Sequence, residues 1–129
     1  MIVIRALDGT NVHVDENAVT LLCGPYPHDV GPHTYVHGVE RGVLVTAEDA
    51  AALAARLRID PPLAKLTRPN ATPVWIKGSV VSAIRAPLPT ERQGPGMVNA
   101  VVILGDLHQA VNEDLATAER VLNAHGAHV

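Results

Sequence analysis

The chain has 129 residues, 47% of them hydrophobic, with no Phe, one Trp and two Tyr. This length allows one domain or two very small ones, and the core must consist of Val, Ile, Leu and Ala. The formal net charge of -3 disfavours a nucleic-acid partner without excluding one, because a general polyanion binder needs a basic face.

The single cysteine, Cys23, excludes an internal disulfide and indicates a reducing compartment. The first residues, Met1-Ile2-Val3-Ile4-Arg5, lack the basic region and long apolar run of a signal peptide. No stretch approaches the roughly 18 apolar residues that a membrane span needs. We therefore expect a cytoplasmic protein without a membrane partner or a cofactor, and the general character of the chain suggests a bacterial origin.

The first half of the chain predicts a series of short strands followed by a helix. Apolar or alternating runs predict strands over 2–7, 12–14, 18–23, 34–39 and 43–45. Asp8-Gly9 is a strong hairpin signal, because Gly tolerates a positive φ. Thr46 is a good N-cap for a helix that ends before Asp60-Pro61-Pro62, since proline cannot donate a hydrogen bond to a helix.

The same pattern restarts at residue 63, at an offset of 62 positions. The matching segments are Ala64–Thr67 with Ile2–Arg5, Asn70-Ala71-Thr72 with Asp8-Gly9-Thr10, and Val74–Ile84 with Val12–Leu22. In this alignment Trp75 replaces His13. Apolar runs over 98–104 and 108–111 predict two more strands, and Asn112-Glu113-Asp114 predicts the start of a second helix.

We therefore predict an α+β fold made of two tandem pseudo-repeats, 1–62 and 63–129. Each would be a mostly antiparallel β-meander of four to five strands followed by one α-helix. A unit of about 60 residues is marginal by itself, and repeats bury their apolar faces by stacking on neighbours. We expect the two repeats to pack into one compact domain.

Short motifs support a family resemblance over nearly the whole chain. They are Lys65-Leu66-Thr67-Arg68-Pro69-Asn70 and Val111-Asn112-Glu113-Asp114 in the second unit, and Leu7-Asp8-Gly9 and Val45-Thr46-Ala47-Glu48 in the first. On these motifs each unit resembles the small flagellar proteins of the FlbD-like (SwrD-like) family. The chain departs from that family's pattern in its two fused copies and long proline-rich loops. The resemblance implies a non-enzymatic β-rich module, and a weaker likeness is to LytTR-type DNA-binding domains.

Three histidines, His28, His33 and His37, are the candidate metal ligands, and Asp29 could add an oxygen. Imidazole is the commonest metal ligand, and a zinc site needs its ligands to converge on the ion. The spacing of these histidines matches no established ligand motif. The alternative is a polar loop followed by an outward-facing strand position.

Two regions are candidate interfaces. The loop over 90–96 carries Glu91, Arg92 and Gln93 followed by flexible glycines, and it could clasp a partner or simply connect two strands. Trp75 alternates with Val74 and Ile76 on its strand, so it faces the other way. An outward Trp often marks an interface, and a place in the core is the equal alternative.

Three functions remain open from the sequence. The first is a non-catalytic structural or protein-interaction module that forms a homo-oligomer, with any other protein partner unknown. The second is a DNA-binding or regulatory module that uses the basic residues of the second repeat, Lys65, Arg68, Lys77, Arg85 and Arg92. The third is a metal-binding protein or small enzyme that uses the histidines. Residues 1–62 carry a net charge of -4 and residues 63–129 one of +1, a contrast that favours pairing of unlike halves.

Overall fold

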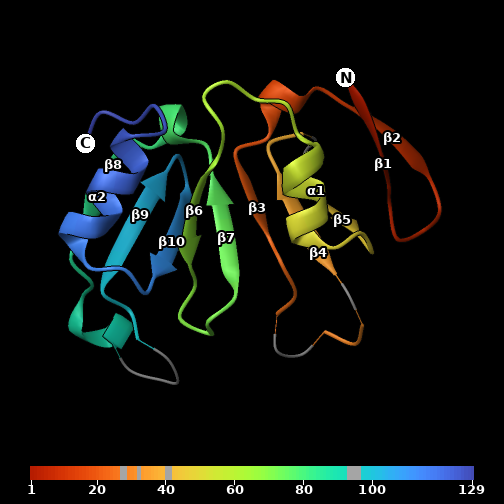
Figure 1. The fold of residues 1–129 in the computed structure, drawn as a ribbon. Coiled ribbons are helices and arrows are strands. Elements are labelled where there is room, and N and C mark those ends of the chain that lie inside the picture. Colours follow the sequence, from red (N-terminus) through yellow and green to blue (C-terminus); the bar gives the residue numbers. More distant parts are fainter. Residues whose placement is uncertain (27–28, 32, 40–41, 93–96) are drawn as a thin grey trace. The chain divides into compact units, whose positions relative to one another are not determined.

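The computed structural model describes residues 1–26, 29–31, 33–39, 42–92 and 97–129 (Figure 1). Within these ranges the chain forms two α-helices and several antiparallel β-sheets. The predicted α+β class is therefore confirmed. The chain divides into two compact units, Met1–Pro62 and Leu63–Val129. None of the described helices has the length and apolar character that crossing a membrane requires.

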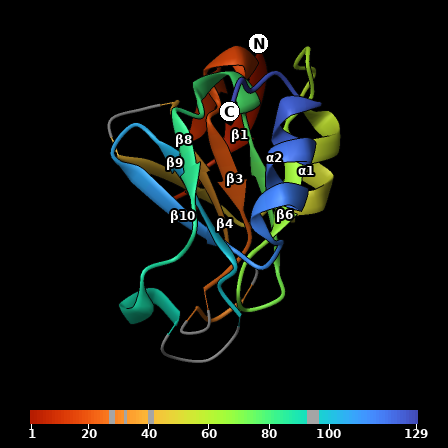
Figure 2. The same cartoon turned by 90° about the vertical axis from the view of Figure 1, so that its left-hand side faces the viewer.

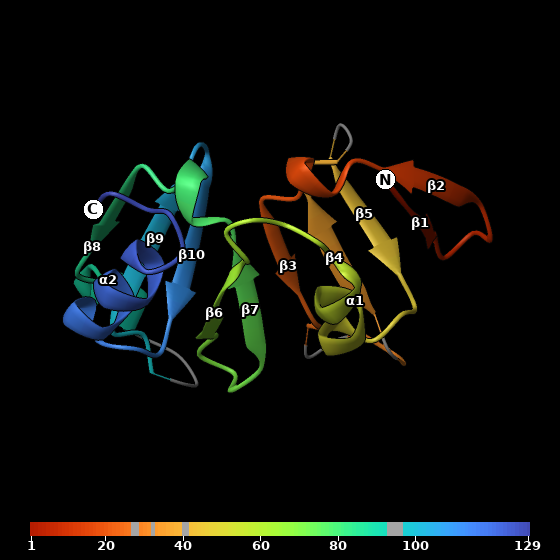
Figure 3. The ribbon, with the colours of Figure 1, turned by 45° about the horizontal axis from the view of Figure 1, so that its top comes forward.

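The first unit combines a hairpin, a three-stranded sheet and a helix. Its elements are β1 (Ile2–Arg5), β2 (Asn11–Val14), the 3-10 turn η1 (Glu16–Ala18), β3 (Leu21–Cys23), β4 (Thr34–His37), β5 (Val43–Thr46) and α1 (Ala50–Arg56). β1 pairs with β2, and β4 lies between β3 and β5, all antiparallel. An Ala6–Thr46 bridge attaches the hairpin to the end of β5. Figure 3 shows α1 over one face of the sheet.

The second unit has the same order of elements with one added turn. Its elements are β6 (Ala64–Thr67), β7 (Pro73–Ile76), η2 (Gly78–Val80), β8 (Ala83–Arg85), η3 (Pro89–Arg92), β9 (Ala100–Leu104), β10 (Leu107–Val111) and α2 (Leu115–Asn123). β6 and β7 form the hairpin, and β9 lies between β8 and β10. The Asn112 N–H donates to the Thr67 carbonyl at 2.7 Å and so attaches the hairpin to the end of β10. Figure 2 shows α2 beside this sheet.

Corresponding elements of the two units are evenly spaced in the sequence. The starts of β1 and β6, β2 and β7, η1 and η2, and β3 and β8 each lie 62 residues apart. The starts of β4 and β9 lie 66 residues apart, because the second unit has the longer loop before its middle strand. The hairpins also close alike: Ala6 N–H donates to Thr10 O, and Arg68 N–H donates to Thr72 O, both at 2.8 Å.

Aliphatic side chains form the core of each unit, as the composition predicts. In the first unit the fully buried side chains include Ile4, Val14, Leu22, Val36 and Leu53; in the second they include Leu66, Val101, Val102, Val111 and Leu122. The apolar run over 98–104 becomes the middle strand β9, which has a partner strand on each side. Ala100, Val101, Val102 and Leu104 of this strand are buried, so both of its faces are covered, and this accounts for its apolar character.

The strand predicted over 18–23 is wrong in its first three residues. Residues 16–18 form η1, and β3 begins at Leu21. The cause is local side-chain chemistry: the Asp15 carboxylate accepts a hydrogen bond from the Asn17 N–H at 3.0 Å. A cap of this kind favours a helical turn over an extended strand.

The predicted N-cap of the first helix is also wrong. Thr46 is the last residue of β5 and is 2% exposed, and its Oγ1 accepts from the Glu48 N–H at 3.2 Å. The cap is Asp49, whose carboxylate accepts from the Ala52 N–H at 3.1 Å. Asp114 caps α2 in the same way, through the Thr117 N–H at 2.8 Å. Both helices thus begin four residues after the last residue of the preceding strand.

Candidate functional site

The candidate metal ligands are only partly described. His28 lies outside the described residues, whereas His33 precedes β4 and His37 ends it. Four residues of extended backbone span about 13 Å, which disfavours a shared ion between these two imidazoles. Among the described residues, no three His, Cys, Asp or Glu side chains are grouped as a metal ion requires. The three-histidine site stays a prediction.

Asp29 organises the proline-rich loop between β3 and β4. Its side chain is 8% exposed and accepts hydrogen bonds from the Tyr35 hydroxyl, at 2.8 and 2.9 Å, and from the Tyr26 N–H at 2.8 Å. The two tyrosine rings meet edge to face at 4.9 Å between centroids. The bond to Asp29 raises the pKa of Tyr35, because losing the phenolic proton would break it. The arrangement stabilises a loop rather than presenting a nucleophile.

Trp75 is a largely buried residue of β7, with an exposed fraction of 8%. It lies directly opposite Lys65 of β6, whose Nζ atom is 5.7 Å from the centroid of the indole ring. The corresponding residue of the first hairpin, His13, lies opposite Val3 and is exposed. An interface role for Trp75 stays a prediction.

Glu91 stabilises the loop that follows β8. Its carboxylate accepts from both terminal nitrogens of Arg85, at 2.7 and 2.9 Å, and from the Leu88 N–H at 2.6 Å. The hydrogen bonds from Arg85 are the main cause that lowers the pKa of Glu91 to about 2, and the Leu88 N–H adds to it. Arg92 ends η3, and neither its side chain nor Gln93 belongs to the described part of the chain. Glu91 therefore stabilises the loop to which it belongs.

Replacing Glu91 by Gln should remove one part of the pH dependence of stability. Because the fold lowers the pKa of Glu91 from 4.5 to about 2, the carboxylate adds stability that is fully present above pH 4.5 and is lost as the pH falls through about 2. The melting temperatures of wild type and Glu91→Gln, measured between about pH 2 and pH 6, should differ most at the upper end and converge at the lower. A difference in melting temperature that is constant over this pH range would contradict the stabilising role of the Glu91 carboxylate.

Three basic residues of the second unit, Lys65, Arg68 and Arg85, contact other side chains. Arg68 is 4% exposed, and its Nε–H donates to Thr72 Oγ1 at 2.8 Å. Arg85 binds Glu91, and Lys65 lies over the Trp75 ring. A nucleic-acid surface needs cations that can reach phosphates, so these contacts weigh against the DNA-binding alternative.

A shallow pocket of ≈ 270 Å³ lies in the first unit, between the β1–β2 hairpin and the start of α1. Its lining residues are Arg5, Ala6, Leu7, Gly9, Thr46, Ala47 and Glu48. Glu48 forms a two-pronged ion pair with Arg56, at 2.8 and 3.0 Å, and Arg56 also donates to the Val3 carbonyl at 3.0 Å. No local sequence motif indicates this pocket, because its two walls are separated by about 40 residues of chain.

No protein-family model, curated protein or solved structure matches this chain. The structure defines the class as a small α+β protein of two similarly ordered units.

Proposed function

We propose that the chain is a tandem duplication that acts as a non-catalytic protein-interaction module, and that its copies associate with one another. The shared order of hairpin, three-stranded sheet and helix supports the duplication, as does the 62-residue spacing from β1 to β3. The FlbD-like motifs agree with a β-rich module without enzymatic activity.

The observation that carries the proposal is an unequal burial of corresponding strands. Leu21, Leu22 and Cys23 of β3 are at most 1% exposed, whereas all three residues of the corresponding strand β8 are half-buried. Val74, Trp75 and Ile76 of β7 are at most 8% exposed, whereas β2 keeps only its last residue buried. Corresponding strands thus differ in burial, and on this proposal a second copy covers the more exposed ones, β2 and β8.

The backbone of β2 is suited to such an addition. Because the Ala6 N–H bonds to Thr10 O, alternation along the antiparallel ladder makes Ile4–Val12 a hydrogen-bonded pair and Val3–His13 a non-bonded pair. The N–H and C=O of His13 therefore point away from β1. An exposed edge of this kind is a template for another strand.

Charge and symmetry favour a head-to-tail arrangement. The first unit carries -4 and the second +1, so contact between unlike units of two copies is electrostatically favoured over contact between two first units. Since β2 and β8 are different surfaces, the contact is heterologous and leads to a ring or an open chain of copies.

Two substitutions at His13 test the use of this edge. His13→Pro removes the outward N–H while keeping the ladder to β1, and proline is tolerated on an edge strand whose N–H faces solvent. His13→Ala keeps the N–H and is the matched control. In sedimentation velocity, His13→Pro should shift the distribution to single chains, whereas His13→Ala should sediment like wild type. If the His13→Pro protein kept its circular dichroism spectrum and associated as strongly as wild type, β2 would not be part of the interface.

A further inference from the structure

The pocket of the first unit has a filled counterpart in the second unit. Glu113 immediately precedes the N-cap Asp114, just as Glu48 precedes Asp49. Thr67 ends β6 as Arg5 ends β1. In the second unit the Glu113 carboxylate accepts from the Thr67 N–H, with 2.9 Å between Oε1 and the nitrogen. A carboxylate thus binds the last N–H of the first strand.

In the first unit the corresponding carboxylate, that of Glu48, binds a side chain instead. Glu48 is held by the Arg56 guanidinium at 2.8 and 3.0 Å, and Arg56 is held in turn by the Val3 carbonyl. By the ladder alternation described above, the Arg5 N–H points away from β2 and toward this side of the hairpin. The place that Glu113 fills in the second unit is open in the first, where the pocket of ≈ 270 Å³ lies.

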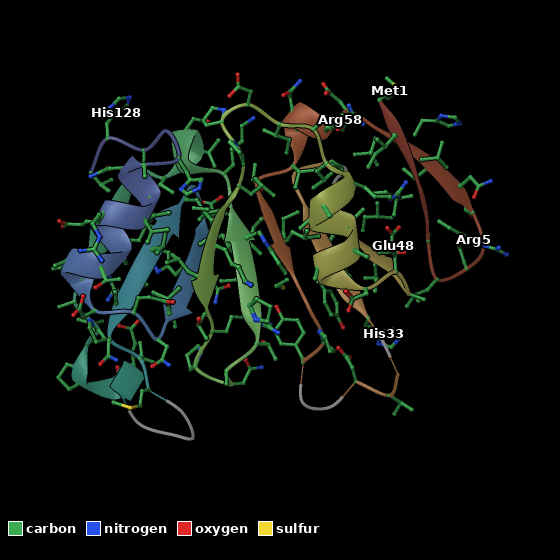
Figure 4. The ribbon with its side chains drawn as sticks, in the orientation of Figure 1. Met1, Arg5, His33, Glu48, Arg58 and His128 are labelled. Atoms are coloured by element: carbon green, nitrogen blue, oxygen red, sulfur yellow. The ribbon has the colours of Figure 1, made fainter. Side chains whose placement is uncertain are left out.

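The charges around the pocket favour an anion. Arg56 neutralises Glu48, whereas no ion pair of Arg5 occurs among the described residues. Figure 4 shows Arg5 on the hairpin and Glu48 at the start of α1, so the two come from the opposite walls. An Arg guanidinium together with a backbone N–H is a common pair of donors for a carboxylate.

We infer that this pocket binds the carboxylate of a small organic acid. The Arg5 N–H and guanidinium take the carboxylate, in the way that the Thr67 N–H takes Glu113. The side chains of Ala6, Leu7 and Ala47 line the same pocket and contact the short hydrocarbon part. Ligand pockets usually measure about 300–1,000 Å³, so the volume suits a molecule of a few carbon atoms. The inference does not depend on self-association.

Succinate is the probe, followed by ¹⁵N–¹H spectra of the full chain at constant ionic strength. We expect saturable shifts confined to the amides of residues 5–9 and 46–48, with a dissociation constant on the order of 1 mM. Sodium chloride and succinamide, which has the same shape but no charge, should give no such shifts. Shifts with succinamide as large as those with succinate would overturn a carboxylate site.

Two substitutions that each remove one positive charge distinguish binding at this pocket from a general effect of the charge of the protein. Arg5→Gln should weaken succinate binding by about tenfold or more, because it removes one charged donor. Arg58→Gln is the matched control, since Arg58 is exposed in the same unit and does not line the pocket; its affinity for succinate should equal that of wild type. Equal weakening by both variants, or unchanged binding in a folded Arg5→Gln protein, would overturn the inference.

Discussion

Gly38→Ala should lower the free energy of unfolding by about 3 kcal/mol. Gly38 follows β4 with a φ of +100°, a conformation that costs a residue with a Cβ about 1 kcal/mol or more. The position is also closed sterically. A Cβ there would collide with the Ala18 carbonyl oxygen and lie 2.9 Å from Thr20 Cγ2 and 3.0 Å from Thr20 N. Two of these atoms are backbone, so relief requires movement of η1 or β4, at a further cost of about 1–3 kcal/mol.

Gly42→Ala is the matched control for this prediction, because it separates backbone strain from collision. Gly42 precedes β5 with a φ of +93°, and a Cβ there would have no atom within 4 Å. It should cost only the strain, about 1 kcal/mol. Urea unfolding followed by circular dichroism measures both variants. Equal losses would mean that η1 does not pack against the end of β4.

Gly78→Ala should produce the second largest loss, about 2–3 kcal/mol. Gly78 begins η2 and is buried, and a Cβ there would collide with the His125 carbonyl oxygen and lie 2.9 Å from Ala127 N. The residues after α2 would have to move away. They would lose the hydrogen bond from Ala127 N–H to Leu122 O, now 3.0 Å long. Amide hydrogen exchange over 125–129 should therefore accelerate beyond the global change.

Gly105→Ala provides the control in the same unit. Gly105 lies in the β9–β10 turn with a φ of +62°, and a Cβ would again have no atom within 4 Å. Alanine there should cost about 1 kcal/mol, without faster exchange at the C-terminal residues. If Gly78→Ala left exchange over 125–129 unchanged, the packing of this segment on η2 would be wrong.

The elements that the sequence predicts well are those specified by local patterns. Asp8-Gly9 forms its turn with Gly9 at a φ of +92°, and the alternating residues of β2 bury Val14 as expected. η1 and η2 were not predicted, because their last residues, Ala18 and Val80, adjoin apolar runs that are typical of strands. In η1 the deciding factor is the Asp15 cap, and in η2 the Lys77 side chain makes no cap bond at all. The second turn thus has no local signal.

Contacts between distant segments explain what the sequence leaves open about the sites. Glu91 stands out in its loop, yet its pairing with Arg85 depends on how η3 folds back. The pocket is lined by residues at the end of β1 and at the end of β5. The Glu48 carboxylate does not fill it, because it pairs with Arg56. Glu113 binds the Thr67 N–H, whereas the corresponding Glu48 binds Arg56, and this difference is visible only in the three-dimensional structure.

The mass of the wild-type protein in solution tests the proposed function most directly. Sedimentation equilibrium, from micromolar to millimolar concentration, should give a mass that rises to at least twice the 13.6 kDa of one chain. Added salt should weaken the association, because unlike charges on the two units contribute to it. A mass of one chain at every concentration would contradict self-association and with it the proposed role of β2 and β8.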